Sequence, residues 1–148
     1  MDAYETARIV ASIATALGVG IAAWQIWRNA EQTRTSFEDS LAKEYRELMR
    51  SVPYKALIGK QVSEGEAERS REGIYNYLDF CNQQIYLRVN KRIRKATWIE
   101  WREGMKINFN LPLFSEVAEE VFKELPQIFG ELRRVRDEEF TSDPAAWR

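Results

Sequence analysis

The sequence contains no histidine and a single cysteine among its 148 residues. The lack of histidine excludes His-based general-base catalysis, Ser-His and Cys-His pairs, and metal sites that contain histidine. One cysteine can form neither a zinc cluster nor an intrachain disulfide, and Cys81 is predicted to be a packed thiol in a reducing compartment. The sequence also lacks a Walker loop and a GxGxxG motif. We therefore expect no catalytic residues, no metal and no cofactor.

The sequence contains only four prolines and seven glycines, and its net charge is close to zero at -1. The charge balance argues neither for nor against a polyanionic partner. The period-two alternation of strands is absent, whereas apolar residues recur at three- and four-residue steps. This spacing predicts helices over about 31–50, 67–89 and 97–109, one that opens at Pro112 and a last one that opens at Pro126. We predict an all-α fold, in which one N-terminal transmembrane helix continues into a cytosolic helical bundle.

The longest uncharged stretch, residues 9–27, predicts the membrane span. At a rise of about 1.5 Å per residue its helix would roughly cross a hydrocarbon core. Trp24 and Trp27 would lie at the headgroup layer, directly before Arg28. More basic residues follow the span than precede it, which predicts an external N-terminus and a cytosolic C-terminal part. The expected domains are a transmembrane helix with a short external N-terminus over 1–29 and a cytosolic helical domain over 30–148.

This span would have two different faces when wound into a helix. The bulky, apolar face contains Ile9, Val10, Ile13, Leu17, Ile21, Trp24 and Trp27. The small or polar face, which is the predicted pore or oligomer face, contains Ala11, Ser12, Thr15, Gly18, Ala22 and Gln25. Ala14, Gly18 and Ala22 form a small-xxx-small row that allows close helix packing, so we expect a homo-oligomer, with a tetramer as one option. A plain tether, a cleaved signal peptide and a buried helix of a soluble bundle remain alternatives.

A basic segment after the third predicted helix is the candidate ligand site. Its residues are Arg88, Lys91, Arg92, Arg94 and Lys95, with Arg102 and Lys106 on the following helix. Their mixture with Trp98 and Trp101 suits phosphates and stacked bases, so we expect exposed cations that bind a nucleotide or short single-stranded DNA, with anionic lipid headgroups as the next candidate. The alternative is a solvated turn beside two core tryptophans. Asn76, Asp79, Asn82 and Gln83 are interpreted as members of a buried hydrogen-bond network.

The sequence N-Y-L-D at residues 76–79, W-x-x-W-x-x-G at 98–104 and NLPLF at 110–114 resembles a set of small bacterial proteins that have one N-terminal span and a helical cytosolic domain. Among these it is most similar to the membrane channel effectors of Hailong-type antiviral systems. The resemblance implies an oligomeric ion channel in the bacterial inner membrane, gated at its cytosolic domain by a nucleotide or short DNA from a partner nucleotidyltransferase. The alternative function is a membrane-tethered helical scaffold or receptor that recruits a cytosolic partner without conduction.

Overall fold

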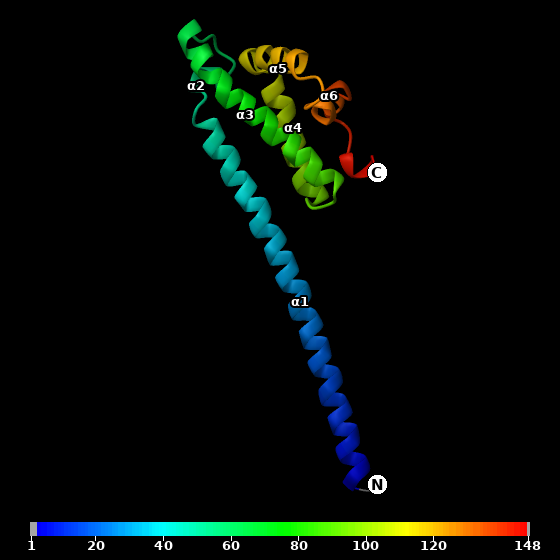
Figure 1. The fold of residues 1–148 in the computed structure, drawn as a ribbon. Coiled ribbons are helices and arrows are strands. Elements are labelled where there is room, and N and C mark those ends of the chain that lie inside the picture. The colour runs from blue at the N-terminus through cyan, green and yellow to red at the C-terminus, as the bar shows by residue number, and fades with distance from the viewer. Residues whose placement is uncertain (1–2, 148) are drawn as a thin grey trace. The chain divides into compact units, whose positions relative to one another are not determined.

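A computed structural model describes residues 3–147, and every regular element in that range is a helix (Figure 1). The elements are α1 (Ala3–Met49), α2 (Tyr54–Leu57), α3 (Glu64–Val89), α4 (Lys95–Phe109), α5 (Pro112–Glu124), α6 (Gly130–Asp137) and the 3-10 helix η1 (Pro144–Ala146). The all-α prediction is therefore confirmed. The chain divides into two compact units, one ending at Phe37 and one beginning at Glu38, so α1 contributes residues to both.

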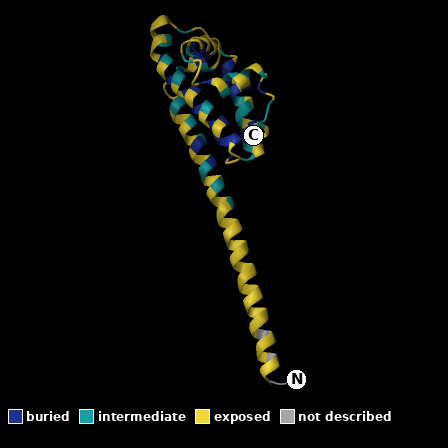
Figure 2. Ribbon diagram, turned by 45° about the vertical axis from the view of Figure 1, so that its right-hand side comes forward, coloured by how far each residue is buried: buried dark blue, intermediate teal, exposed yellow. Residues whose placement is uncertain are grey.

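In the first unit, α1 is long and apolar enough to cross a membrane. None of its apolar stretch is buried, and Figure 2 shows this part of the helix as exposed. The same length and composition would fit a signal sequence near the N-terminus. The side chain of Val10, expected on the bulky face, lies outside the described residues.

The second unit is a bundle built around α3. This helix packs against α5, α6 and η1, while α4 packs against α5. The predicted inner face of α3 is confirmed, because Ile74, Tyr77, Leu78, Cys81 and Ile85 are all buried. The C-terminal end of α1 also joins this core through buried Leu41 and the partly buried Tyr45 and Met49.

Local signals explain where two helices differ from expectation. Helix α3 begins at Glu64 rather than near residue 67, because Ser63 and Glu66 form a reciprocal capping box. The last helix does not open at Pro126 but at Gly130. Residues 126–128 form a turn in which the Ile128 amide donates to the Leu125 carbonyl at 3.2 Å. That turn leaves Ile128 exposed and delivers Phe129 into the core.

Gly73 allows the turn after α1 to lie directly on α3. A Cβ atom at this position would lie 2.1 Å from Ser51 Oγ and 3.1 Å from Ser51 Cβ. The first distance is sterically forbidden and the second is tighter than most Cβ contacts, so this close approach of the two segments depends on the absence of a side chain at residue 73. By contrast, a Cβ atom at Gly104 on α4 would meet no atom within 4 Å.

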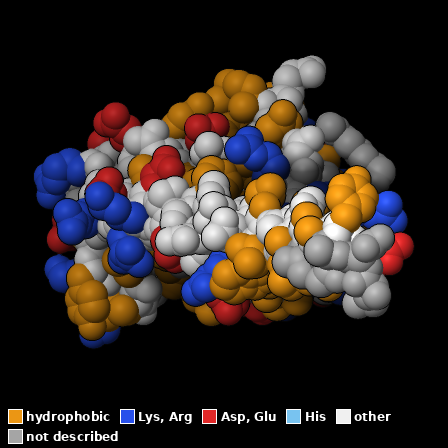
Figure 3. Space-filling model, turned by 90° about the horizontal axis from the view of Figure 1, so that it is seen from below, with side chains coloured by type: hydrophobic (Ala, Val, Ile, Leu, Met, Phe, Trp, Pro, Cys, Tyr) orange, Lys and Arg blue, Asp and Glu red, His pale blue; other side chains and the backbone are white. Residues whose placement is uncertain are grey.

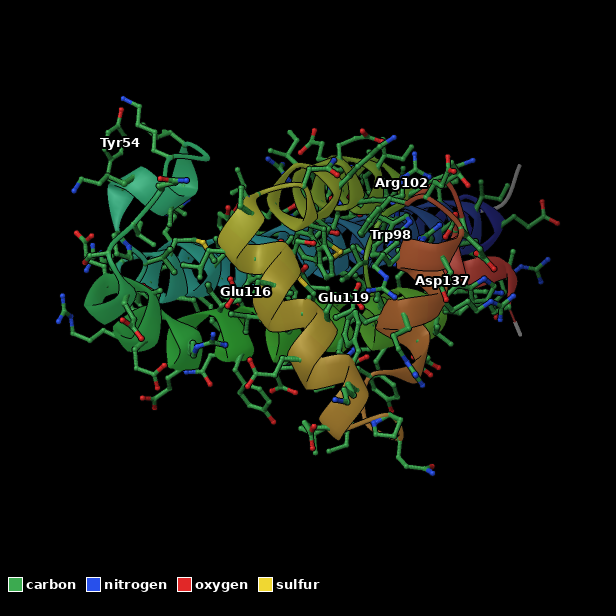
Figure 4. The ribbon with its side chains drawn as sticks, turned by 90° about the horizontal axis from the view of Figure 1, so that it is seen from above. Tyr54, Trp98, Arg102, Glu116, Glu119 and Asp137 are labelled. Atoms are coloured by element: carbon green, nitrogen blue, oxygen red, sulfur yellow. The ribbon has the colours of Figure 1, made fainter. Side chains whose placement is uncertain are left out.

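Salt bridges join α5 to its neighbours on the surface of the bundle. Arg71 of α3 pairs with Glu116 at 2.7 Å and also with Glu120, and Arg136 of α6 pairs with Glu119 at 2.6 Å. Figure 4 shows Glu116 and Glu119 along α5, with Tyr54 at the far end of the domain. Because the glutamates are exposed, these bridges orient α5 more than they stabilise it.

Candidate functional site

The small or polar face of α1 is exposed along its length within its own unit. Ser12 Oγ donates to the Arg8 carbonyl and Thr15 Oγ1 to the Ala11 carbonyl, both at 2.9 Å. These bonds within the helix satisfy both hydroxyl protons, so the two residues are compatible with a membrane environment. Among the described residues, Gln25 has no hydrogen-bond partner for its amide. An amide near the end of a span needs either water or a neighbouring helix.

The opposite face of α1 carries large exposed apolar side chains. Leu17 is 62% exposed and Trp27 is 65% exposed. Exposing this much apolar surface to water would be unfavourable, so the face is suited to contact with lipid or protein. Figure 3, seen from below, shows hydrophobic side chains exposed among other groups on this view of the molecule. The Arg28 guanidinium lies 5.3 Å from the centroid of the Trp24 ring, a cation–π contact at the expected headgroup level.

The basic segment follows a tight end of α3. The Lys91 amide donates to the Arg88 carbonyl and the Arg92 amide to the Leu87 carbonyl, both at 2.9 Å. This is a Schellman motif, in which glycine is the preferred residue at the left-handed position. Here Lys91 occupies that position with φ of 57°, so its backbone is strained. Lys91 is held beside Arg92, and both side chains are exposed.

Arg88 is buried rather than exposed, contrary to the expectation for the basic segment. Its Nε donates to Asp143 Oδ1 and its Nη2 to Asp143 Oδ2, both at 2.7 Å. Its Nη1 donates to the Ile93 carbonyl, also at 2.7 Å. The hydrogen bonds from Arg88 lower the pKa of the Asp143 carboxyl, and these outweigh the opposing effect of burial. Arg88 therefore attaches the C-terminal segment to the end of α3.

Arg94 is likewise half-buried and bound to another part of the domain. Glu38, which is 6% exposed, accepts hydrogen bonds from Arg94 Nη2 at 2.6 Å and from the Arg94 amide at 2.9 Å. Arg94 Nε and the Thr97 hydroxyl also donate to this carboxylate, at 2.9 Å and 2.8 Å. Burial raises the pKa of Glu38, but these hydrogen bonds have the larger combined effect and lower it. The carboxylate thus joins the C-terminal part of α1 to the N-terminus of α4.

The remaining predicted ligand residues differ in their surroundings. Arg102 Nη1 donates to the Thr141 carbonyl at 2.7 Å, and Figure 4 shows this residue with Trp98 beside the C-terminal segment. Lys91, Arg92, Lys95 and Lys106 have exposed side chains. Trp98 is a core residue with no exposed surface, as the alternative interpretation expected, and its Nε1 donates to the Ser142 carbonyl at 3.2 Å. The structure thus separates cations that hold the fold together from cations that lie at the surface.

The buried network predicted for the polar residues of α3 was wrong for three of its members. Asn76, Asp79 and Gln83 are exposed, and only Asn82 is half-buried, donating to the Ile128 carbonyl at 3.3 Å. The polar side chains that α3 does bury include Gln84 and Arg88. Both follow the helical spacing of the apolar face, because residues 77, 81, 84, 85 and 88 share one side of a helix. That spacing was the missed signal.

Gln84 lines a pocket of about 290 Å³ between the end of α1, α3 and α4. Its other lining residues are Ala42, Tyr45, Arg46, Tyr77, Glu100, Trp101, Gly104 and Met105. Gln84 is only 5% exposed, and its amide makes no hydrogen bond to any residue in the described range 3–147. Its amide is not among the fully buried side-chain groups that lack a partner in this range, so it keeps some accessible surface and can meet a molecule in the pocket.

The aromatic walls of this pocket are held in place by hydrogen bonds. Asn108 Nδ2 donates to the Tyr77 hydroxyl at 3.0 Å and to the Tyr45 hydroxyl at 3.4 Å. The Tyr45 and Tyr77 rings meet edge to face, with centroids 6.1 Å apart. Burial raises the pKa of the neighbouring Cys81 thiol to about 12, so this cysteine is a packed, unreactive thiol, as predicted.

No group of histidine, cysteine, aspartate or glutamate in the described residues could hold a metal ion. Comparison with known protein families, characterised proteins and solved structures finds no match to this chain.

Proposed function

We propose that the protein is an oligomeric single-pass membrane effector whose spans form an ion channel, controlled by an anionic nucleotide or short single-stranded DNA at the helical domain. The domain lies in the bacterial cytosol and the N-terminus lies outside. The resemblance to antiviral membrane effectors supports a role in defence, with a partner nucleotidyltransferase as the source of the ligand.

One observation carries this proposal: the exposed span has a bulky apolar face opposite a face that is small and polar except at Val19 and Ile26. A simple tether is surrounded evenly by lipid and has no need for this difference. In an oligomer, the residues Ser12, Thr15 and Gln25 would face a shared interior, where polar side chains in membrane segments usually lie. The bulky face, with Leu17 and Ile21, would contact lipid.

The contacts within the basic segment show which of its cations are available to a ligand. Arg88 and Arg94 already bind carboxylates of the domain, so replacing them would disturb the fold. Lys95 and Lys106 have exposed side chains and form no hydrogen bond with another described residue, although the charge of Lys95 helps to lower the pKa of Asp143. They are the better candidates for contacts with phosphate.

Cysteine accessibility in the purified full chain, reconstituted in liposomes, tests the channel. We expect an aqueous, charged thiol reagent to modify Thr15→Cys and Ala22→Cys and to reduce ion flux, while Leu17→Cys and Ile21→Cys stay unmodified. The native Cys81 is a low background, because it is buried and its pKa of about 12 leaves little thiolate.

The opposite result would favour the alternative function. If all four engineered cysteines are equally protected and the liposomes show no ion flux, the spans pack as a dry bundle. The protein would then act as a membrane-tethered scaffold or receptor, and the proposed channel would be wrong.

A further inference from the structure

We propose that the pocket lined by Gln84, Tyr45 and Trp101 binds a nucleotide through its base. The proposal rests on the proposed function in one respect, namely that the helical domain receives an anionic ligand. It differs from the basic-segment prediction because it places the recognition of the ligand between α1, α3 and α4. Every residue involved belongs to the second compact unit.

The unpartnered amide of Gln84 is the first reason. A glutamine side chain presents a donor and an acceptor next to each other, and it can form two parallel hydrogen bonds with the edge of a base. Gln84 is 5% exposed, lines the pocket and has no hydrogen-bond partner among the described residues. A ligand edge with one donor and one acceptor would satisfy both groups at once.

The shape and chemistry of the walls are the second reason. Tyr45, Tyr77 and Trp101 supply aromatic surface and Met105 supplies a flexible apolar one. Aromatic side chains stack on bases of any sequence, since every base has a π-face. A volume of about 290 Å³ lies at the lower end of small-molecule pockets. It therefore suits a compact ring better than an extended chain.

The charges among the lining residues are the third reason. Arg46 lines the pocket, is exposed, and forms no hydrogen bond or ion pair with a described residue. A guanidinium can bind two oxygens of a phosphate at once. Glu100, also a lining residue, is a carboxylate that repels phosphate, so Arg46 is the cation among the lining residues that can hold one.

Binding of nucleoside monophosphates to the full chain in detergent, measured by calorimetry, tests the proposal. The probes are the adenine, guanine, cytosine and thymine deoxynucleoside monophosphates, and we expect at least one of them to bind. Gln84→Leu keeps the approximate side-chain volume but removes both hydrogen-bonding groups, so it should weaken binding roughly ten- to hundredfold. Arg46→Gln should also weaken binding and should reduce its dependence on salt.

Two variants control for effects on folding. Gln83→Leu changes an exposed glutamine next to Gln84 that does not line the pocket, and it should leave binding unchanged. Gly104→Leu places a side chain at a lining residue where a Cβ atom would meet nothing within 4 Å, and it should abolish binding while the protein stays folded. Gln84→Leu should leave the melting temperature nearly unchanged, because the amide forms no hydrogen bond within the described range that the variant would remove.

Three results would overturn the pocket proposal. These are no binding of any probe to the unchanged chain, equal binding by Gln84→Leu, and a lower melting temperature for Gln84→Leu, which would show that the amide supports the fold. Since none of these measurements requires conduction, they are separate from the liposome test. Binding without any change in ion flux would contradict the proposed channel alone.

Discussion

The guanidinium of Arg88 and the carboxylate of Asp143 form two parallel hydrogen bonds of 2.7 Å between residues that are 55 positions apart. Asp143 Oδ1 also accepts from the Ala145 amide at 3.1 Å and so caps η1. One side chain therefore closes the C-terminal segment onto α3. Arg88, which was expected to bind a ligand, is therefore a structural residue.

This pair predicts an asymmetric loss of stability. Asp143→Leu leaves a buried guanidinium without its partner and should lower the free energy of unfolding by about 3–5 kcal/mol. Arg88→Met should cost less, because the Asp143 side chain is 28% exposed and water can reach it. The double variant should recover part of the loss. Urea unfolding of the full chain in detergent measures all three, with Lys123→Met, an exposed site on α5, expected to stay within about 0.5 kcal/mol.

The same contacts predict how stability depends on pH. The pKa values of Asp143 and Glu38 are lowered in the folded state from ordinary values of 3.8 and 4.5. The unfolded chain therefore binds more protons in this range, and stability is lost as the pH falls below those ordinary values toward the folded pKa values. The difference in unfolding free energy between the unchanged chain and Asp143→Asn should shrink from about pH 6 to about pH 3. A difference that stays constant over this range would contradict the assignment.

Gly73 should tolerate no side chain. Gly73→Ala places Cβ against Ser51 and should lower the unfolding free energy by about 1–3 kcal/mol, the usual cost of overpacking. Gly104→Ala is the matched control, also within a helix, and should gain up to about 1 kcal/mol from helix propensity. Adding Ser51→Gly to Gly73→Ala should restore stability, since it removes both clashing atoms. Equal effects of the two alanine variants would show that no close contact exists at residue 73.

Lys91 should be more stable as glycine. Its left-handed backbone, with φ of 57°, costs a residue with a side chain about 1–2 kcal/mol. Lys91→Gly should recover much of this in thermal or urea unfolding, whereas Lys91→Ala keeps the strain and should show no such gain. If both variants change stability equally, the effect comes from the lost charge and not from the backbone.

Assembly through the small face of α1 should depend on Gly18. Gly18→Leu blocks close approach of neighbouring helices and should reduce the oligomer size seen by crosslinking in detergent. Gly20→Leu is the matched control, because residue 20 lies on the opposite side of the helix and a Cβ atom at either glycine meets nothing within 4 Å of the chain. An unchanged oligomer in Gly18→Leu would leave the helical domain as the only contact between copies.

Hydrophobic spacing by itself determined the helical class, the apolar span and the inner face of α3. These features depend on local periodicity, and residues such as Ile74, Leu78 and Cys81 repeat at the steps of a helix. The capping box at Ser63 was also readable, because both its members lie within one turn, although the expected start near residue 67 missed it.

Only the tertiary structure decided which cations are structural and where a ligand could enter. Arg88 and Arg94 are paired by Asp143 and Glu38, partners that are 55 and 56 positions away, and no local pattern identifies such distant contacts. Gln83 and Gln84 are chemically identical neighbours, yet the first is exposed and the second is buried in a pocket. The difference follows from a rotation of about 100° per residue combined with the packing of α1 and α4 on one side of α3. The rotation per residue can be read from the sequence, whereas the packing of α1 and α4 on α3 is known only from the folded structure.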